Sequence, residues 1–146
     1  MKIAFGCDHS AFKLKTALVE YVRELGHEVE DFGCMSEESV DYPDYAALVA
    51  DAVADGRFDR GILICYTGIG MSITANKVQG VRCALCSEPV SASLTRGHNN
   101  TNVLSMGAGM IGLAMAREIV RVWLSTEFEG GRHQRRVDKI TAYEAR

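Results

Sequence analysis

Short apolar segments alternate along the chain with longer segments whose apolar residues recur every three to four positions. Five of the short segments have the length and composition of buried strands, at residues 2–7, 27–32, 61–66, 81–86 and 102–106. Helical spacing predicts helices over residues 12–25, 41–53, 70–77, 89–96, 111–124 and 130–146. Gly26 ends the first of them, and Pro43 stands in the first turn of the second.

This order predicts an α/β fold in which five parallel strands form a doubly wound, Rossmann- or flavodoxin-like sheet. Helices should cover both faces and make a three-layer α/β/α arrangement. Residues 61–66 form the most continuous apolar run, which is typical of a central strand. No linker or low-complexity tract interrupts the pattern, so we expect a single domain over residues 1–146.

Composition and charge narrow the class of protein. The chain has 146 residues, 47% of them hydrophobic and 24% charged, which is typical of a globular domain able to bury a core without disulfides. A formal net charge of -3 gives no general attraction to nucleic acid or to an anionic membrane. The first residues do not resemble a signal peptide, and no apolar segment could span a bilayer. We expect a soluble, cytoplasmic protein.

The cysteines favour free thiols over disulfides or a metal centre. They are five in number, and only Cys83 and Cys86 have Cys-x-x-Cys spacing, without a second pair. A redox pair would sit at a helix N-terminus, whereas these two cysteines fall within the expected fourth strand. A redox role is therefore disfavoured.

Polar residues gather beside the expected strands. In a doubly wound sheet, ligands bind at the carboxyl ends of the strands, so we expect one site there. Asp8 could equally cap the first helix together with Ser10, whereas His9, beside a carboxylate, favours a functional role. The residues expected to meet in this site are Asp8, His9, Cys65, Thr67, Gly68, Gly70, His98 and Asn99. The last two could equally belong to a plain polar loop.

The segment from Cys65 to Ser72 places two glycines between a strand and a helix, where backbone N–H groups can bind an anion. It lacks the Lys-Ser/Thr ending of a P-loop and the six-residue dinucleotide pattern, so nucleotide binding is disfavoured. Cys65 ends its strand next to a helix N-terminus, an environment that favours a reactive thiolate, whereas Cys7, Cys83 and Cys86 are expected to be buried and structural. A basic group near the C-terminus is by itself typical of a solvated helix face; it comprises Arg132, His133, Arg135, Arg136 and Lys139.

Six motifs occur in order: Gly6-Cys7-Asp8-His9, Asp41-Tyr42-Pro43, Cys65 with Thr67-Gly68-x-Gly70, Ala75-Asn76-Lys77, His98-Asn99, and Gly131 to Arg136. In this combination the chain resembles the type B ribose-5-phosphate isomerase family over essentially its whole length. That family also includes galactose- and allose-6-phosphate isomerases. The resemblance implies interconversion of D-ribose 5-phosphate and D-ribulose 5-phosphate through an enediolate, without a metal or organic cofactor. It also implies a homodimer, or a tetramer built from two dimers, with sites at the subunit interface and the C-terminal helix on a partner.

The resemblance assigns a role to each candidate. Cys65 moves the proton between C2 and C1, because Met71 stands where other members carry a glutamate base. Thr67 assists the hydroxyl protons, and His98 opens the sugar ring with Asp8 as a nearby proton acceptor. The remaining assignments are oxyanion binding by the N–H groups of Gly68, Ile69, Gly70 and Met71, sugar binding by Tyr42 and Asn99, and phosphate binding by His9, Arg132 and Arg136, the arginines reaching across the dimer.

Two positions depart from the family pattern. Gly109 stands where an arginine is common, and Tyr66 follows the expected base where glycine is general. An isomerase of a six-carbon sugar phosphate, of the allose 6-phosphate type, is therefore the alternative reading. A second alternative is a flavodoxin-like binding module without catalysis, which would bind flavin or nucleotide.

Overall fold

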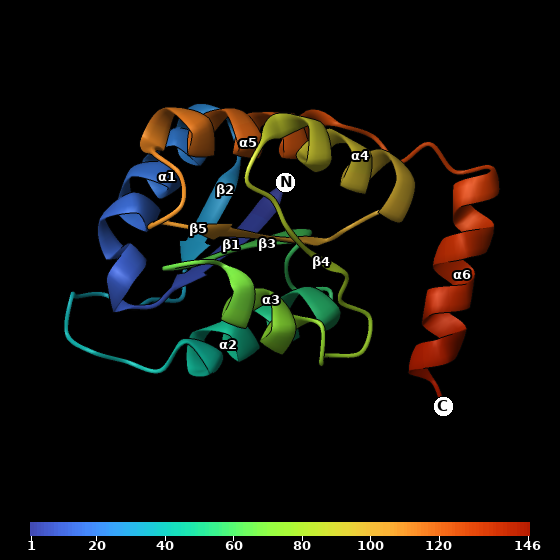
Figure 1. Cartoon of the computed structure of the whole chain (residues 1–146), viewed down its shortest axis with the longest axis horizontal. Helices are drawn as coiled ribbons and strands as arrows, with labels where there is room; N and C mark the ends of the chain where they lie inside the picture. The colour runs from blue at the N-terminus through green and yellow to red at the C-terminus, as the bar shows by residue number, and fades with distance from the viewer.

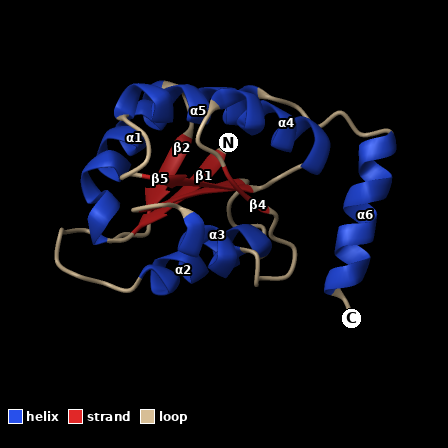
Figure 2. Cartoon of the chain, viewed as in Figure 1, coloured by secondary structure: helices blue, strands red, loops and turns tan.

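The computed structural model describes all 146 residues and contains one parallel sheet in the order β2-β1-β3-β5-β4 (Figure 2). Its strands are β1 (Lys2–Cys7), β2 (Glu28–Asp31), β3 (Arg60–Cys65), β4 (Cys83–Leu85) and β5 (Val103–Gly107). Strands β1 and β3 are neighbours, and the chain extends from β1 to β2 on one side. On the other side it runs from β3 to the edge strand β4 and then returns to β5, which lies between β3 and β4. The doubly wound parallel sheet expected from the sequence is confirmed.

Helices cover both faces of this sheet (Figure 1). One face carries α1 (Phe12–Glu24), α4 (Pro89–Asn99) and α5 (Leu113–Ser125), and the other carries α2 (Tyr42–Ala54) and α3 (Ile69–Ala75). Alternate residues of a strand point to opposite faces, so Ile62 and Ile64 of β3 enter the core beneath α1 and α5, while Leu63 enters the core beneath α2. All three side chains are fully buried.

Helix α2 packs unusually close to the central strands because glycine stands beneath it. A Cβ atom at Gly61 would lie 2.6 Å from Cγ1 of Val49, and one at Gly6 would lie 2.8 Å from Cγ2 of the same residue. Real Cβ atoms essentially never approach this closely. The two glycines therefore bring the start of α2, which carries Tyr42, close to the carboxyl ends of β1 and β3.

Helix α6 (Arg132–Glu144) stands apart from the three layers, beside α4 (Figure 1). Gly130 and Gly131, with φ of 67° and 54°, turn the chain into it. It buries only His133 and Val137, and Glu144 Oε2 accepts a hydrogen bond of 3.0 Å from the Gly80 amide. Its large apolar side chains Ile140 and Tyr143 remain exposed. Packing of this helix on a partner subunit stays a prediction. No helix in the structure has the length and apolar character needed to cross a bilayer.

Two expected boundaries were wrong. Strand β4 has three residues where residues 81–86 were expected, since Val81 is held in a turn by its N–H bond to Val78 O and Cys86 follows the strand. Helix α4 continues past Arg96 to Asn99, because Asn100, with φ of 48°, is the residue that ends it in the left-handed region. His98 and Asn99 are therefore not loop residues but occupy the last turn of a helix.

A buried ion pair fixes α1 to the end of β2. Lys15 is fully buried, and its Nζ donates to Asp31 Oδ2 at 2.5 Å and to the carbonyl oxygen of Cys34 at 2.8 Å. A buried ammonium group needs such partners, because desolvation would otherwise disfavour its charge. The pair therefore orients the segment that leads from β2 to α2 along the edge of the site.

Candidate active site

A hollow of about 400 Å³ lies at the carboxyl ends of β1 and β3, where the winding of the sheet reverses. Such a reversal point is where open α/β sheets bind ligands, because the flanking loops diverge and leave a crevice. The hollow is lined by Asp8, Tyr42, Cys65, Tyr66, Thr67, Ile69, Gly70 and Ile73. We call it the Cys65 pocket.

Cys65 is the last residue of β3, and its side chain is held by the loop that follows. The residue is only 5% exposed, and its Sγ accepts a hydrogen bond of 3.1 Å from the backbone N–H of Gly68. Gly68 has φ of 79°, and its carbonyl oxygen accepts a bond of 2.6 Å from Ser105 Oγ. The backbone of this loop therefore fixes the position of the Cys65 sulfur in the pocket.

The start of α3 offers further donors beside the sulfur. The N–H of Ile69 is occupied, since it donates to Thr67 Oγ1 at 3.2 Å. The N–H groups of Gly70 and Met71 donate to no other atom of the chain. The side chain of Met71 lies in the core, so this residue contributes only its backbone. Free amides at a helix N-terminus suit a developing negative charge on a ligand.

Three of the other thiols are held in the neutral form. Burial raises the pKa of Cys7 to about 12, that of Cys83 to about 12 and that of Cys86 to about 11. The thiolate is the reactive form of cysteine, so these three groups are inert at neutral pH. Cys65 is the cysteine that lines the pocket.

Asp8 does cap the turn that follows β1, as one of its two expected roles required. Its Oδ1 accepts bonds from the Ser10 backbone N–H at 3.1 Å and from Ser10 Oγ at 2.6 Å. The same side chain also lines the Cys65 pocket, where its second oxygen has no partner in the chain. The cap therefore fixes the carboxylate in position without using up its second acceptor.

His9 is oriented by the segment before α2. Its Nδ1 accepts a bond of 3.1 Å from the backbone N–H of Val40, so in the neutral ring the proton is on Nε2. Tyr42, the first residue of α2, lines the Cys65 pocket with its ring against Gly70. Of the predicted site residues in these elements, Asp8, Tyr42, Cys65 and Thr67 thus meet in the Cys65 pocket, whereas His9 is not part of its lining.

Within one chain, His98 and Asn99 do not join this group, so the expectation of a single converging site was wrong for them. They lie at the end of α4, which returns the chain to β5 and so ends near the amino ends of the strands. His98 lines a small hollow with Glu127 and Glu129, and Asn99 lines a second hollow of about 400 Å³ between α4, β4 and α6. Because the strands are parallel, each connecting helix begins near the carboxyl ends of the strands and finishes near their amino ends.

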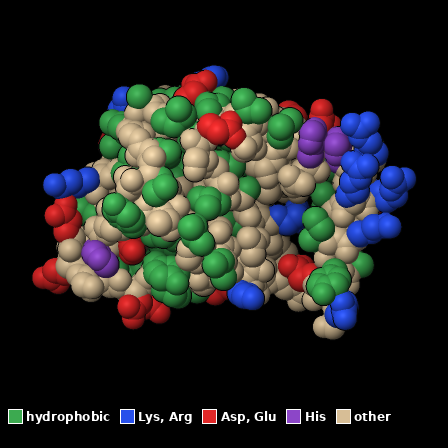
Figure 3. Space-filling model, viewed as in Figure 1, with side chains coloured by type: hydrophobic (Ala, Val, Ile, Leu, Met, Phe, Trp, Pro, Cys, Tyr) green, Lys and Arg blue, Asp and Glu red, His purple; other side chains and the backbone are tan.

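Arg132 and Arg136 are likewise remote from the Cys65 pocket in the single chain. Both are exposed on α6, where lysine and arginine side chains gather on the outer surface of the helix (Figure 3). Neither lines the pocket, whose lining contains no lysine or arginine. A phosphate group in the Cys65 pocket would therefore lack these arginines unless another subunit supplied them.

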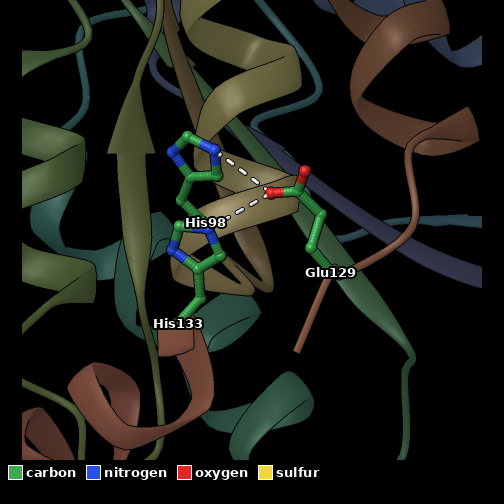
Figure 4. A group of neighbouring side chains, drawn as sticks. All are labelled: His98, Glu129 and His133. Carbon is green, nitrogen blue, oxygen red and sulfur yellow. Dashed lines mark ion pairs between the residues drawn. The ribbon is translucent and has the colours of Figure 1, made fainter. Parts of the chain in front are cut away.

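Sequence reasoning did not find Glu129, which joins two histidines (Figure 4). Its Oε2 lies 3.1 Å from Nε2 of His98 and 3.4 Å from Nε2 of His133, and the two imidazole rings stack at 4.2 Å with an interplanar angle of 8°. Burial lowers the pKa of His133, and the positive charges of His98, Arg132 and Arg136 lower it further, against the opposing effect of Glu129. Glu129 lies before the turn at Gly130 and Gly131 and outside α6, so no helical spacing in the sequence signals this pair.

These three side chains are also the candidate metal ligands of the chain, with their ligand atoms within 4.8 Å of one another. The lone pair of an imidazole nitrogen lies in the plane of its ring. Two rings stacked at 8° hold these lone pairs in two separate, parallel planes, so they do not converge on one ion. The arrangement instead places one carboxylate oxygen within ion-pair distance of both rings.

The fold and the Cys65 pocket define a doubly wound α/β protein with a cysteine-containing pocket at the reversal point of its sheet. The family model for ribose/galactose isomerases matches residues 3–140. The chain belongs to the ribose/galactose isomerase family and, by family, is an aldose–ketose isomerase.

Individual relatives agree with this assignment. The chain is 57% identical over 145 residues to ribose-5-phosphate isomerase B of Escherichia coli, covering 99% of this chain and 97% of that protein. It is 44% identical over 145 residues to D-erythrulose-4-phosphate isomerase of Pectobacterium atrosepticum, covering 99% and 95%. The solved structure of ribose-5-phosphate isomerase B from Clostridium thermocellum superposes with a TM-score of 0.98 at 48% identity, covering 99% and 98%.

Proposed function

We propose that the protein interconverts D-ribose 5-phosphate and D-ribulose 5-phosphate, with Cys65 as the group that moves the proton between carbons. The hydrogen bond from the Gly68 amide to Cys65 Sγ carries this proposal, since it fixes the sulfur in the lining of a pocket large enough for a sugar phosphate. The names of the E. coli and C. thermocellum relatives support the choice of substrate.

The proton transfer balances without a cofactor. The Cys65 thiolate takes the C2 proton of the open-chain aldose, and the electron pair of that C–H bond forms the C1–C2 double bond of an enediolate, while the C1 carbonyl oxygen becomes an oxyanion. The thiol then returns the proton to C1 as the C2 carbonyl forms, and the C2 hydroxyl proton passes to O1. Thr67, in the pocket beside Cys65, assists this hydroxyl proton. The free amides of Gly70 and Met71 stabilise the oxyanion.

The complete site forms between subunits of a homodimer, or of a tetramer built from two such dimers. Helix α6 presents exposed apolar side chains, and its arginines suit a phosphate dianion that the Cys65 pocket cannot neutralise alone. The partner's α4 supplies the ring-opening histidine and the sugar-binding asparagine, which correspond to His98 and Asn99. His9, with its Nε2 free, completes the phosphate site from the first subunit.

The chain acts as one isomerase domain over residues 1–146, in the cytoplasm. The five cysteines are all unpaired, as in proteins of reducing compartments. A six-carbon sugar phosphate is the alternative substrate, because Tyr66 and Gly109 change the surroundings of the pocket. The relative that is named for a four-carbon sugar phosphate supports variation in chain length among these enzymes.

Ketose formation from ribose 5-phosphate tests the proposal. We expect Cys65→Ala to lower kcat by about 10²- to 10⁴-fold, the usual contribution of a positioned acid–base group. Cys86→Ala is the matched control, because this thiol is equally buried but lies outside the pocket, and it should retain turnover. Equal rates for wild type and Cys65→Ala would overturn the proposal.

A further inference from the structure

Two tyrosines frame the Cys65 pocket, and each is seated on a glycine. A Cβ atom at Gly70 would lie 2.9 Å from Cδ1 of Tyr42, and one at Gly109 would lie 2.7 Å from Cδ2 of Tyr66, with other ring atoms of each tyrosine closer still. Both tyrosines line the pocket. The pocket therefore has two aromatic walls whose positions depend on the absence of a side chain behind them.

Gly109 is not needed for its backbone conformation. Its φ lies outside the left-handed region in which other glycines of the chain are found. What forbids a side chain at this position is the ring of Tyr66, since a separation below 3.0 Å is one that real Cβ atoms essentially never show. The two residues therefore form a steric pair.

The backbone holds this pair in register. The Gly109 N–H donates to the carbonyl oxygen of Tyr66 at 2.8 Å, and the Ala108 N–H donates to the carbonyl oxygen of Cys65 at 2.8 Å. These two bonds continue the pairing of β3 and β5 beyond the ends of both strands. The Tyr66 ring is thus positioned from the same backbone that positions the Cys65 sulfur.

The Tyr66 side chain is also available to a ligand. The residue is 61% exposed. A solvent-exposed tyrosine ring lacks the favourable apolar contacts that burial would give it. It adjoins Cys65 in sequence and lines the same hollow. A ring in this position shortens the space open to a bound sugar chain and offers an apolar face to its C–H groups.

We propose that Tyr66, held in place by Gly109, is a specificity-determining residue that contacts the sugar phosphate and limits the length of the carbon chain accepted in the Cys65 pocket. This inference rests on the proposed isomerase function and concerns the choice among aldose phosphates. The ring favours a five-carbon over a six-carbon substrate, because one extra carbon must displace it.

The test compares kcat/KM for ribose 5-phosphate and allose 6-phosphate. Tyr66→Ala should shift the ratio of the two values toward the six-carbon sugar by at least about tenfold, which is the usual discrimination for one carbon unit in a pocket. Tyr66→Phe keeps the ring and should keep the wild-type ratio. An unchanged ratio in Tyr66→Ala, or an Ala-like ratio in Tyr66→Phe, would overturn the proposal.

Gly109→Ala tests the steric pair. We expect it to shift the same ratio in the wild-type background but to have little further effect in the Tyr66→Ala background, where the clash is absent. Such non-additivity is the signature of residues in contact. Gly112→Ala is the matched control, since a Cβ at Gly112 meets no atom within 4 Å, and it should leave the ratio unchanged. Equal behaviour of the Gly109 and Gly112 variants would also overturn the proposal.

The two possible failures are distinguishable. If the wild-type protein converts neither sugar phosphate, the proposed function fails. If it converts them, and Tyr66→Ala and Gly109→Ala both keep the wild-type ratio of kcat/KM values, the isomerase function stands and the specificity role alone is wrong.

Discussion

Gly68 donates its backbone N–H to the sulfur of Cys65 across a distance of 3.1 Å. This contact requires the left-handed conformation of Gly68, with φ of 79°, at the point where β3 gives way to α3. Only glycine adopts that region without a steric cost. The position of the Cys65 sulfur therefore depends on a single residue that carries no side chain.

Gly68→Ala should reduce both stability and turnover. A Cβ there would lie 2.7 Å from the backbone carbon of Met106, so the loop must move and withdraw its N–H from Cys65. We expect a loss of at least about 2 kcal/mol in the free energy of unfolding, from the left-handed strain and the clash together, measured by urea denaturation, and a lower kcat.

Gly56→Ala is the control for the strain alone, because Gly56 has φ of 73° but a Cβ there would meet no atom within 4 Å. It should lose less stability than Gly68→Ala and retain kcat. If the two variants lost the same stability and activity, the close contact with Met106 would have no role.

Mixing two impaired variants should restore activity if the site is shared between subunits. Cys65→Ala removes the acid–base group, and Arg132→Ala should raise KM by about tenfold or more through the loss of a charge-assisted bond to phosphate. In a mixed dimer, one of the two sites combines an intact Cys65 with an intact Arg132 from the other subunit. Random reassociation of equal amounts should therefore give about one quarter of wild-type activity in a symmetric dimer, measured at a substrate concentration well below the KM of the Arg132 variant.

Activity of the mixture no greater than the mean of the two separate variants would contradict a site shared in this way. Replacing Arg132→Ala by Arg121→Ala supplies the control, since Arg121 is exposed on α5 and pairs only with Glu118. The Arg121→Ala variant should be active by itself, before it is mixed with Cys65→Ala.

Acid should destabilise the protein through His133. Burial lowers the pKa of this group below its ordinary value of 6.5. At pH values between the folded-state pKa of His133 and 6.5, the unfolded chain binds more protons than the folded one. The contribution of His133 to the free energy of unfolding is therefore fully present above pH 6.5 and is lost as the pH decreases through the folded-state pKa. We expect the fall in Tm between about pH 7.5 and about pH 5.5 to be smaller in His133→Gln than in wild type.

The difference between the two proteins isolates His133 from the other groups that titrate in this range, including His27, whose pKa burial also lowers. An equal fall in Tm for wild type and His133→Gln would show that the pKa of His133 does not change on folding.

The fold was predictable because its signals are local. Apolar runs of strand length and helical spacing each arise within a few neighbouring residues, so the chain reveals five parallel strands and two helical layers before any contact between them is known. The helix boundaries are less local. Helix α4 was expected to end near Arg96, but it ends at Asn100. His98 and Asn99 therefore lie in the helix and not in a loop.

The candidate site likewise has a part that the sequence predicts and a part that only the tertiary structure decides. Cys65, Thr67, Gly68 and Gly70 belong to one strand–loop–helix segment, so the sequence by itself determined that a thiol and a glycine loop lie together. Only the tertiary structure decided the pairs that join distant segments, namely Lys15 with Asp31, His98 with Glu129, and Tyr66 with Gly109. These pairs arise from tertiary packing. The ring of Tyr66 excludes a side chain at position 109, although the two residues are far apart in the sequence, and no pattern among their sequence neighbours predicts the contact.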